Sequence, residues 1–191
     1  MKYISLILLI TILASCKYDK EDAGLQAEFA GVQVDTTITQ AEFRPREIKY
    51  LFVHAIATDP NQGRWSAERL KKFFREERKW DKYGYHEYID REGRVWTLTP
   101  LNKDTKIQYD ELTYNASGYN SISIAISLEG GCQYIKGKLL PKDNFTPIQF
   151  QRIEERIKYY QKQVPNIKVL PHNAVNKNKA CPSFDIKKLK I

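Results

Sequence analysis

Three side chains of this 191-residue chain have the chemistry of a zinc site, although they lie far apart in the sequence. His54 ends the mostly apolar run 48–53, and His172 follows the apolar residues 169–171. Cys181 comes shortly after His172. Two imidazoles and one thiolate can hold zinc with tetrahedral geometry and leave the fourth position open for water, as in catalytic zinc sites. A catalytic metal site is therefore one interpretation of these residues.

Each of these side chains also has an ordinary structural interpretation. A histidine at the end of a strand is more often a hydrogen-bonded part of the framework. A cysteine before a proline, such as Cys181, is more often a small buried side chain. The spacing from His172 to Cys181 is not that of a named metal motif, so the residue types alone leave both interpretations open.

The segments around these residues alternate between strand and helix patterns. Thr146, Pro147 and Gln149 carry three signals for the start of a helix. Periodicity predicts strands at 48–54, 85–89, 95–98, 121–128 and 167–170, helices at 66–80 and 146–163 with a short one from about 183, and loops at 99–120 and 132–145. This interleaving predicts an α/β fold with helices packed on the faces of a sheet.

The first residues resemble an export signal and not a part of the fold. The apolar run 4–14 is far shorter than the ~20 residues needed to span a bilayer, but it fits the hydrophobic region of a secretory signal. The tetrapeptide LASC at 13–16 resembles a bacterial lipobox, in which Cys16 becomes the lipid-modified first residue. An ordinary signal peptide with an incidental cysteine is the alternative.

These features predict a signal peptide over 1–15, a tether over 16–45 and a folded domain over 46–191. Lipid chains on Cys16 would hold the domain at a membrane without a spanning helix. Lys17, directly after the cysteine, resembles the signals of lipoproteins sent on to the outer membrane. We therefore expect an exported lipoprotein of the outer membrane of a Gram-negative bacterium, on a face that the sequence leaves open.

Composition and charge narrow the class of protein. The chain has 31 Lys+Arg and 23 Asp+Glu, a formal charge of +8, with 42% hydrophobic and 28% charged residues. This composition excludes wholesale disorder and a polytopic membrane protein. A basic surface favours an anionic wall polymer as partner, although solvated lysines and arginines explain the charge equally well. No interleaved aromatic and basic motif is present, so nucleic acid is not an expected partner. The expected state is a monomer.

Five segments resemble, in order, those of the type-2 N-acetylmuramoyl-L-alanine amidases, the family of phage lysozyme-type amidases and peptidoglycan recognition proteins. They are FVHAIAT at 52–58, YGYH at 83–86 with DREGRV at 90–95, GYNS at 118–121 before a strand that ends in GG at 130–131, NFTP at 144–147, and HNAVNKNKACPSFD at 172–185. The resemblance covers residues 48–190 and is closest to the phage branch in its last segment. It implies a central mixed β-sheet flanked by helices.

The resemblance also implies an activity and roles for five residues. The folded domain would be a zinc amidase that cuts peptidoglycan between the muramoyl lactyl group and L-alanine. Zn²⁺ would be its cofactor, with His54, His172 and Cys181 as the ligands. Tyr85 matches the tyrosine placed near the metal-bound water. Lys179 matches the lysine that supports the charged intermediate.

The chain departs from the family pattern at two places. Residues 176–178 make the last ligand segment one residue longer than in the phage branch, so that the loop before Lys179 must bulge. Asn115 stands where the family often has a histidine in the substrate cleft, which bears on substrate preference. Tyr85 and His86 are neighbours on a strand and point to opposite faces, so His86 is expected in the core. Cys132 is expected to be a buried thiol without a role.

Two other functions stay open at this point. The first is a non-catalytic peptidoglycan-binding module on the same fold, but binders of this family often lack the cysteine ligand that Cys181 provides. The second is a peptidase that uses Cys181 as a nucleophile beside a histidine. Pro182 follows that cysteine, and no helix start is evident there that would lower the pKa of the thiol. The zinc amidase is therefore the leading hypothesis.

Overall fold

A five-stranded mixed β-sheet forms the centre of the computed structural model, which describes residues 39–191. The strand order is β4-β3-β6-β2-β9. The strands are β2 (Tyr50–Ala55), β3 (Glu87–Ile89), β4 (Val95–Thr97), β6 (Ser123–Leu128) and β9 (Lys168–Pro171). Strand β2 pairs in parallel with β6 and β9, β3 pairs in parallel with β6, and only β4 is antiparallel to its neighbour within this sheet. The predicted fold class, a central mixed sheet flanked by helices, is confirmed.

Alternation along β6 separates the two faces of the sheet. Ile124 and Ile126 belong to the larger apolar cluster, together with Ile153 and Ile157 of helix α3 (Pro147–Gln163). Ala125, on the opposite face, belongs to a second cluster rich in aromatic side chains. Both faces are buried, which is the usual environment of central parallel strands.

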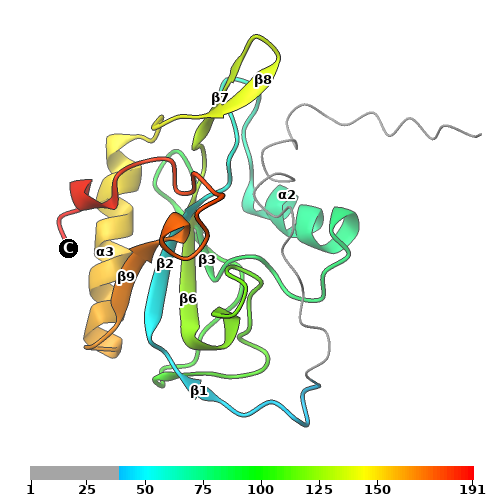
Figure 1. Cartoon of the computed structure of the whole chain (residues 1–191), viewed down its shortest axis with the longest axis vertical. Coiled ribbons are helices and arrows are strands. Elements are labelled where there is room, and N and C mark those ends of the chain that lie inside the picture. Colours follow the sequence, from blue (N-terminus) through cyan, green and yellow to red (C-terminus); the bar gives the residue numbers. More distant parts are fainter. Residues whose placement is uncertain (1–38) are drawn as a thin grey trace, which may run out of the picture.

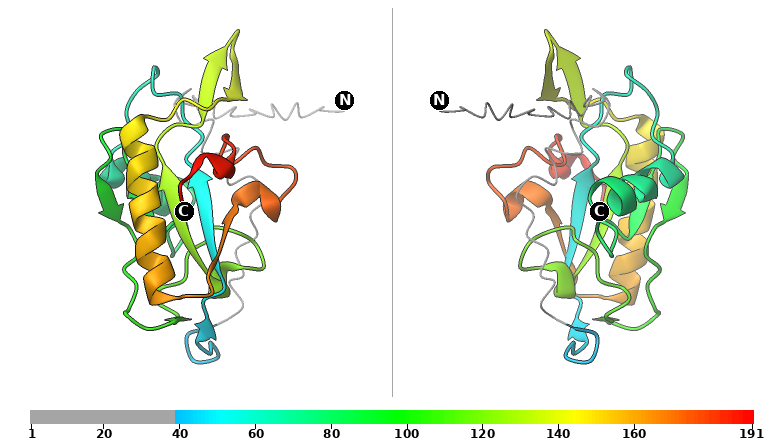
Figure 2. Two further views of the ribbon diagram at one scale, coloured as in Figure 1. Left: turned by 90° about the vertical axis from the view of Figure 1, so that its left-hand side faces the viewer. Right: turned by 90° about the vertical axis from the view of Figure 1, so that its right-hand side faces the viewer.

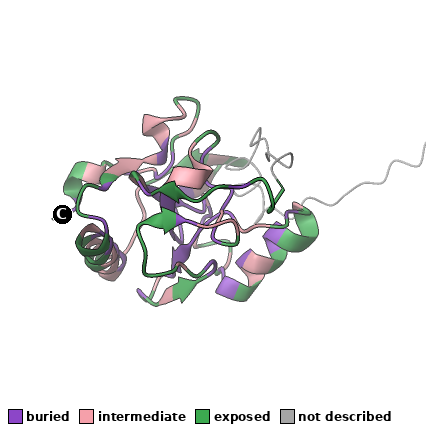
Figure 3. Ribbon diagram, turned by 90° about the horizontal axis from the view of Figure 1, so that it is seen from below, coloured by how far each residue is buried: buried purple, intermediate pink, exposed green. Residues whose placement is uncertain are grey.

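The two helices lie on opposite sides of the sheet (Figure 1; Figure 2). Helix α3 begins with the predicted capping box, in which the Thr146 side chain accepts the Gln149 N–H and Gln149 reaches back to the Thr146 N–H. Helix α2 (Ala67–Lys72) begins at the Ser66 N-cap and continues as a π-helical turn, Phe73–Glu77. Figure 3 shows the buried residues gathered in the sheet and on the inner sides of the helices.

Several predicted boundaries are wrong. The predicted loop 132–145 contains a β-hairpin of β7 (Cys132–Ile135) and β8 (Lys138–Pro141). One side of this hairpin mixes apolar and charged side chains, so the sequence lacks the alternation that marks a half-buried strand. Within the predicted loop 99–120, β5 (Lys106–Ile107) pairs with β1 (Arg46–Glu47).

Smaller differences concern the ends of elements. A 3₁₀ turn, Asn120–Ile122, precedes β6, which therefore starts two residues later than predicted. The last short helix is the 3₁₀ turn Ile186–Lys188, somewhat beyond the predicted start near 183. The predicted signal peptide, the lipid anchor at Cys16 and most of the tether lie outside the described residues. Within residues 39–191, no helix has the length and apolar character that crossing a membrane requires.

Candidate metal centre

The three predicted ligands meet at the carboxyl edge of the parallel strands. His54 lies near the end of β2, and His172 follows the last residue of β9. These two strands are parallel neighbours with Val53 opposite Pro171, so the next residue of each strand is a histidine at the same edge. Cys181 returns to this edge after the turn that follows His172. The candidate ligand atoms of the three residues all lie within 4.8 Å of one another, and all three side chains are buried.

The donor set and its spacing fit zinc. The Cys181 Sγ atom lies 3.6 Å from His54 Nδ1, and the imidazole rings of His54 and His172 have centroids 4.5 Å apart. With Zn–S near 2.3 Å and Zn–N near 2.0–2.1 Å, a tetrahedral angle puts a sulfur and a nitrogen ligand about 3.5 Å apart. Two imidazoles and one thiol at this spacing can therefore hold zinc and leave a fourth position for water or substrate.

Hydrogen bonds from two backbone N–H groups hold Cys181 against β2, the strand that carries His54. The Ala55 N–H, next to His54, donates to Cys181 Sγ at 3.3 Å. The Asn173 N–H, next to His172, donates to the Cys181 carbonyl at 3.0 Å. These two hydrogen bonds link Cys181 to the residues next to His54 and His172, which holds the three ligand positions together.

Gly131 is a supporting residue whose role the sequence did not reveal. It lies just after β6 with a φ of +98°, and a Cβ atom there would lie 2.6 Å from the Cβ of Ala55. Its N–H donates to Asn144 Oδ1 at 2.8 Å, and the Asn144 amide donates to the Cys132 carbonyl at 2.7 Å. Only a residue without a side chain allows this approach to the ligand strand. The Gly-Gly pair at the strand end was the only sequence signal of such a contact.

The structure places Tyr85 beside the metal centre. Its ring is fully buried, and its centroid lies 5.2 Å from that of His54. Lys179 is half-buried and lies in a turn closed by its N–H to the Asn176 carbonyl at 3.1 Å. The segment 176–179, where the sequence predicted a bulge, thus forms a turn that ends two residues before Cys181.

His86 is buried, as the sequence predicted, although Tyr85 and His86 precede β3 and do not lie on a strand. Its Nδ1 accepts the Ala125 N–H at 3.0 Å, and its Nε2 lies 3.0 Å from the Glu111 carbonyl oxygen. These partners require a neutral ring with the proton on Nε2. Burial lowers the pKa of His86 to about 3, which keeps the ring neutral. Because both ring nitrogens contact the backbone, His86 does not join the metal ligands.

Asn115 and Cys132 are also buried. The Asn115 amide donates to Thr113 Oγ1 at 2.9 Å and lies within 3.3 Å of Ser123 Oγ. Asn115 thus belongs to an internal hydrogen-bond cluster beside β6. Cys132 begins β7 at the base of the hairpin, a buried thiol as predicted.

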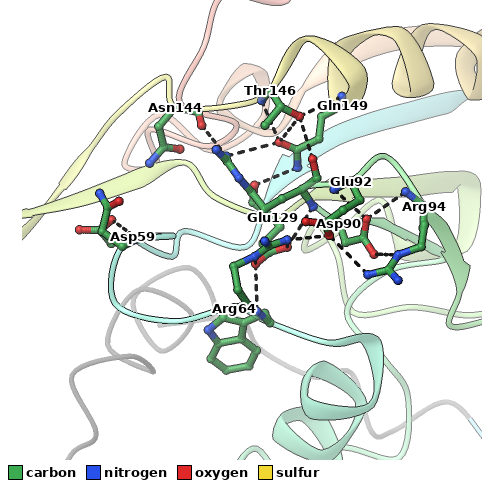
Figure 4. Close-up of polar contacts among 12 residues, drawn as sticks. Asp59, Arg64, Asp90, Glu92, Arg94, Glu129, Asn144, Thr146 and Gln149 are labelled. Atoms are coloured by element: carbon green, nitrogen blue, oxygen red, sulfur yellow. Dashed lines mark hydrogen bonds and ion pairs between the residues drawn. The ribbon is translucent and has the colours of Figure 1, made fainter.

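A hydrogen-bond network around Glu129 joins the loops that follow β2 and β3 (Figure 4). The Glu129 carboxylate is fully buried and accepts the N–H groups of Trp65 at 2.9 Å and Arg91 at 3.0 Å. It also accepts Arg64 Nε at 2.8 Å. The hydrogen bonds of Glu129 and Glu92 raise the pKa of Arg64 above its ordinary value. This single carboxylate joins the segment after β2 to the turn after β3.

The fold and the donor set define an α/β domain with a candidate His–His–Cys metal centre at the carboxyl edge of its parallel strands. The family model described as N-acetylmuramoyl-L-alanine amidase matches residues 44–184. The chain belongs to this family.

Known relatives agree with this assignment. The chain is 31% identical over 152 residues to an endolysin of Klebsiella phage KP32 and 33% identical over 154 residues to an endolysin of Enterobacteria phage T3. Each match covers 79% of this chain and 91% of the relative. Among solved structures, the N-acetylmuramoyl-L-alanine amidase LysC from Clostridium intestinale URNW aligns with a TM-score of 0.57 at 17% identity, over 78% of this chain and 88% of LysC. This last likeness shows the fold.

Proposed function

We propose that this chain is a zinc-dependent N-acetylmuramoyl-L-alanine amidase. It hydrolyses the amide bond between the muramoyl lactyl group and L-alanine in peptidoglycan. The observation that carries the proposal is the convergence of His54, His172 and Cys181 in a chain of this family, with ligand atoms within 4.8 Å of one another.

Two further side chains have the chemistry that amide hydrolysis needs. When bound, zinc supplies Lewis acidity and an activated water at neutral pH. The Tyr85 hydroxyl, carried by a ring that packs on His54, would orient the attacking water or give a proton to the leaving nitrogen. The Lys179 ammonium, two residues from Cys181, stabilises negative charge that develops on the carbonyl oxygen.

A cysteine peptidase is the second candidate, because Cys181 Sγ lies 3.6 Å from His54 Nδ1. A nucleophile and its base need such a contact. However, the same sulfur accepts the Ala55 N–H. The ligand atom of His172 also lies within 4.8 Å of those of His54 and Cys181, which supports a shared metal ion. EDTA separates the two candidates, since it inactivates the amidase and leaves a cysteine peptidase active.

Detection of the reaction product distinguishes an enzyme from a binding module without activity. The full chain is incubated with purified sacculi, and newly freed amino groups of L-alanine are measured together with the zinc content. We expect release of L-alanine amino groups and one zinc per chain. Retention on sacculi without release, in protein loaded with zinc, would identify a binding module.

The ligand assignment has a matched control within the chain. Cys181→Ser is expected to lose zinc and activity, whereas Cys132→Ser, a change at an equally buried thiol, is expected to keep both. His54→Ala is expected to behave like Cys181→Ser. Full zinc occupancy in the Cys181→Ser protein would contradict the assignment.

The cellular setting is part of the proposal. The lipobox-like segment before Cys16 supports an exported lipoprotein anchored to the outer membrane of a Gram-negative bacterium, with peptidoglycan as partner. The enzyme works as a monomer and without nucleic acid. Labelling of growing cells with radioactive palmitate tests the anchor: the wild-type chain is expected to be labelled and Cys16→Ser is not. Equal labelling of both would refute it.

A further inference from the structure

The β7–β8 hairpin projects from the end of the sheet beyond the rest of the domain (Figure 1; Figure 2). Its register pairs Ile135 with Lys138 and Gln133 with Leu140, so these four side chains share one side of the hairpin. On this side Ile135 is 45% exposed and Leu140 is 42% exposed. An isolated pair of strands that exposes two large aliphatic side chains has an apolar surface to cover.

The charged side chains of residues 132–142 are all lysines. Lys136, Lys138 and Lys142 are exposed, and residues 132–142 contain no acidic side chain. The next residue, Asp143, forms an ion pair with Lys188 of the C-terminal segment. Within residues 39–191, Lys136, Lys138 and Lys142 form no ion pair, so this part of the hairpin presents aliphatic side chains beside positive charges.

Hydrogen bonds tie the base of the hairpin to the domain, and its tip is a regular turn. At its base, the Tyr134 N–H donates to the buried Asp59 carboxylate at 2.8 Å. The Asn144 side chain accepts the Gly131 N–H and donates to the Cys132 carbonyl. At its tip, Lys136 and Gly137 have φ of +49° and +79°, as in the two-residue turns that match the twist of a hairpin. A surface fixed in this way loses little conformational entropy when it binds.

We propose that the hairpin docks the domain on an anionic lipid bilayer. Ile135 and Leu140 enter the boundary between headgroups and acyl chains, and the three lysines contact lipid phosphates. A hydrated anionic wall polymer would satisfy the lysines, but it offers no apolar phase to the two aliphatic side chains.

The test places a local reporter on the full chain. Ile135→Trp is mixed with phosphatidylcholine vesicles that carry brominated acyl chains, with and without phosphatidylglycerol. We expect a blue shift and quenching of the added tryptophan, stronger with the anionic lipid and weaker at high salt. Tyr159→Trp is the matched control, because Tyr159 is 41% exposed near the C-terminal end of α3. Figure 1 shows this end of the helix away from the hairpin. Its added fluorescence is expected to stay unquenched.

The charge requirement is tested on the same reporter. Lys136→Gln and Lys138→Gln should each lower the apparent affinity of docking about fivefold on anionic vesicles. Lys158→Gln, at an exposed lysine of α3, should leave it unchanged. Unchanged zinc content shows that each variant is folded.

Three results would overturn the proposal: no quenching of the tryptophan at 135, equal quenching on neutral vesicles, or shielding of this tryptophan by sacculi instead of vesicles. The last result would assign the hairpin to the wall. Because the readout is independent of hydrolysis, the docking proposal and the amidase proposal can fail separately.

Discussion

Gly131→Ala is the substitution that most directly tests how the fold supports the metal centre. The new Cβ would lie 2.6 Å from the Cβ of Ala55 and 3.4 Å from Phe145 Cζ. The first distance is far below van der Waals contact, so the ligand strand or the loop must shift. The φ of +98° adds strain, because only glycine adopts this conformation readily.

The two costs have known magnitudes. A residue held in an unfavourable backbone conformation costs about 1–3 kcal/mol, and overpacking a well-packed interior costs about 1–3 kcal/mol. We therefore expect the free energy of unfolding to fall by about 2–6 kcal/mol. We also expect weaker zinc binding, because the displaced Ala55 is next to His54 and donates its N–H to Cys181 Sγ.

Gly118→Ala separates the backbone strain from the clash. Gly118 has a φ of +80°, and its Cβ would meet no atom within 4 Å. In urea unfolding, Gly118→Ala should therefore lower the free energy of unfolding by about 1–3 kcal/mol through strain alone. Gly131→Ala should lower it further. Zinc affinity, measured by competition with a chelator, should fall only for Gly131→Ala. The double variant Gly131→Ala/Ala55→Gly removes the Cβ–Cβ contact and should recover part of both losses.

The outcome that refutes this reasoning is equal destabilisation at the two glycines with unchanged zinc affinity of Gly131→Ala. The close approach between the strand end and Ala55 would then not control the position of the ligands. Destabilisation without any change in zinc affinity would separate the two effects and assign Gly131 to the fold alone.

Three other substitutions test the interior around the centre. Tyr85→Phe should reduce turnover on sacculi about 10²-fold or more while one zinc stays bound; undiminished turnover would remove the hydroxyl from the reaction. Burial lowers the pKa of His86 from 6.5 to about 3, so below pH ~6.5 the unfolded chain binds a proton that the folded chain does not. Stability should therefore fall between pH ~6.5 and ~3, by up to about 1.4 kcal/mol per pH unit, and urea unfolding of His86→Gln should show a shallower fall. Glu129→Gln should lower the free energy of unfolding by about 1–3 kcal/mol, because a neutral amide cannot satisfy the N–H groups of Trp65, Arg91 and Arg64 equally well. A free energy of unfolding equal to that of the wild type would show that the network is dispensable.

Local chemistry explains why some elements were predicted closely. The start of α3 follows from the side chains of Thr146, Pro147 and Gln149, which satisfy the first turn whatever packs around it. The hairpin of β3 and β4 follows from apolar residues on either side of the turn at 91–93. In both cases residues a few positions apart decide the structure.

Other elements depend on contacts that local patterns do not contain. The β7–β8 hairpin exposes Ile135 and Leu140 beside lysines, so its hydrophobic pattern is that of a loop. Its stability depends on Asp59, more than seventy positions from Tyr134, and on Asn144. Helix α2 turns into a π-helix at Phe73, where its aromatic side chains pack into the second cluster. Distant partners determine both features.

The metal centre depends both on residue types that the sequence shows directly and on contacts between distant residues. The residue types indicated zinc chemistry, but His54 and Cys181 lie 127 positions apart, and spacing alone could not bring them together. The family resemblance supplied the grouping. The physical cause is the strand order: β9 lies beside β2 in parallel with Pro171 opposite Val53, so each strand delivers a histidine to the same edge. A shift of β9 by one residue would turn His172 to the other face of the sheet. The register of β9 against β2 is therefore as essential to the centre as the ligands themselves.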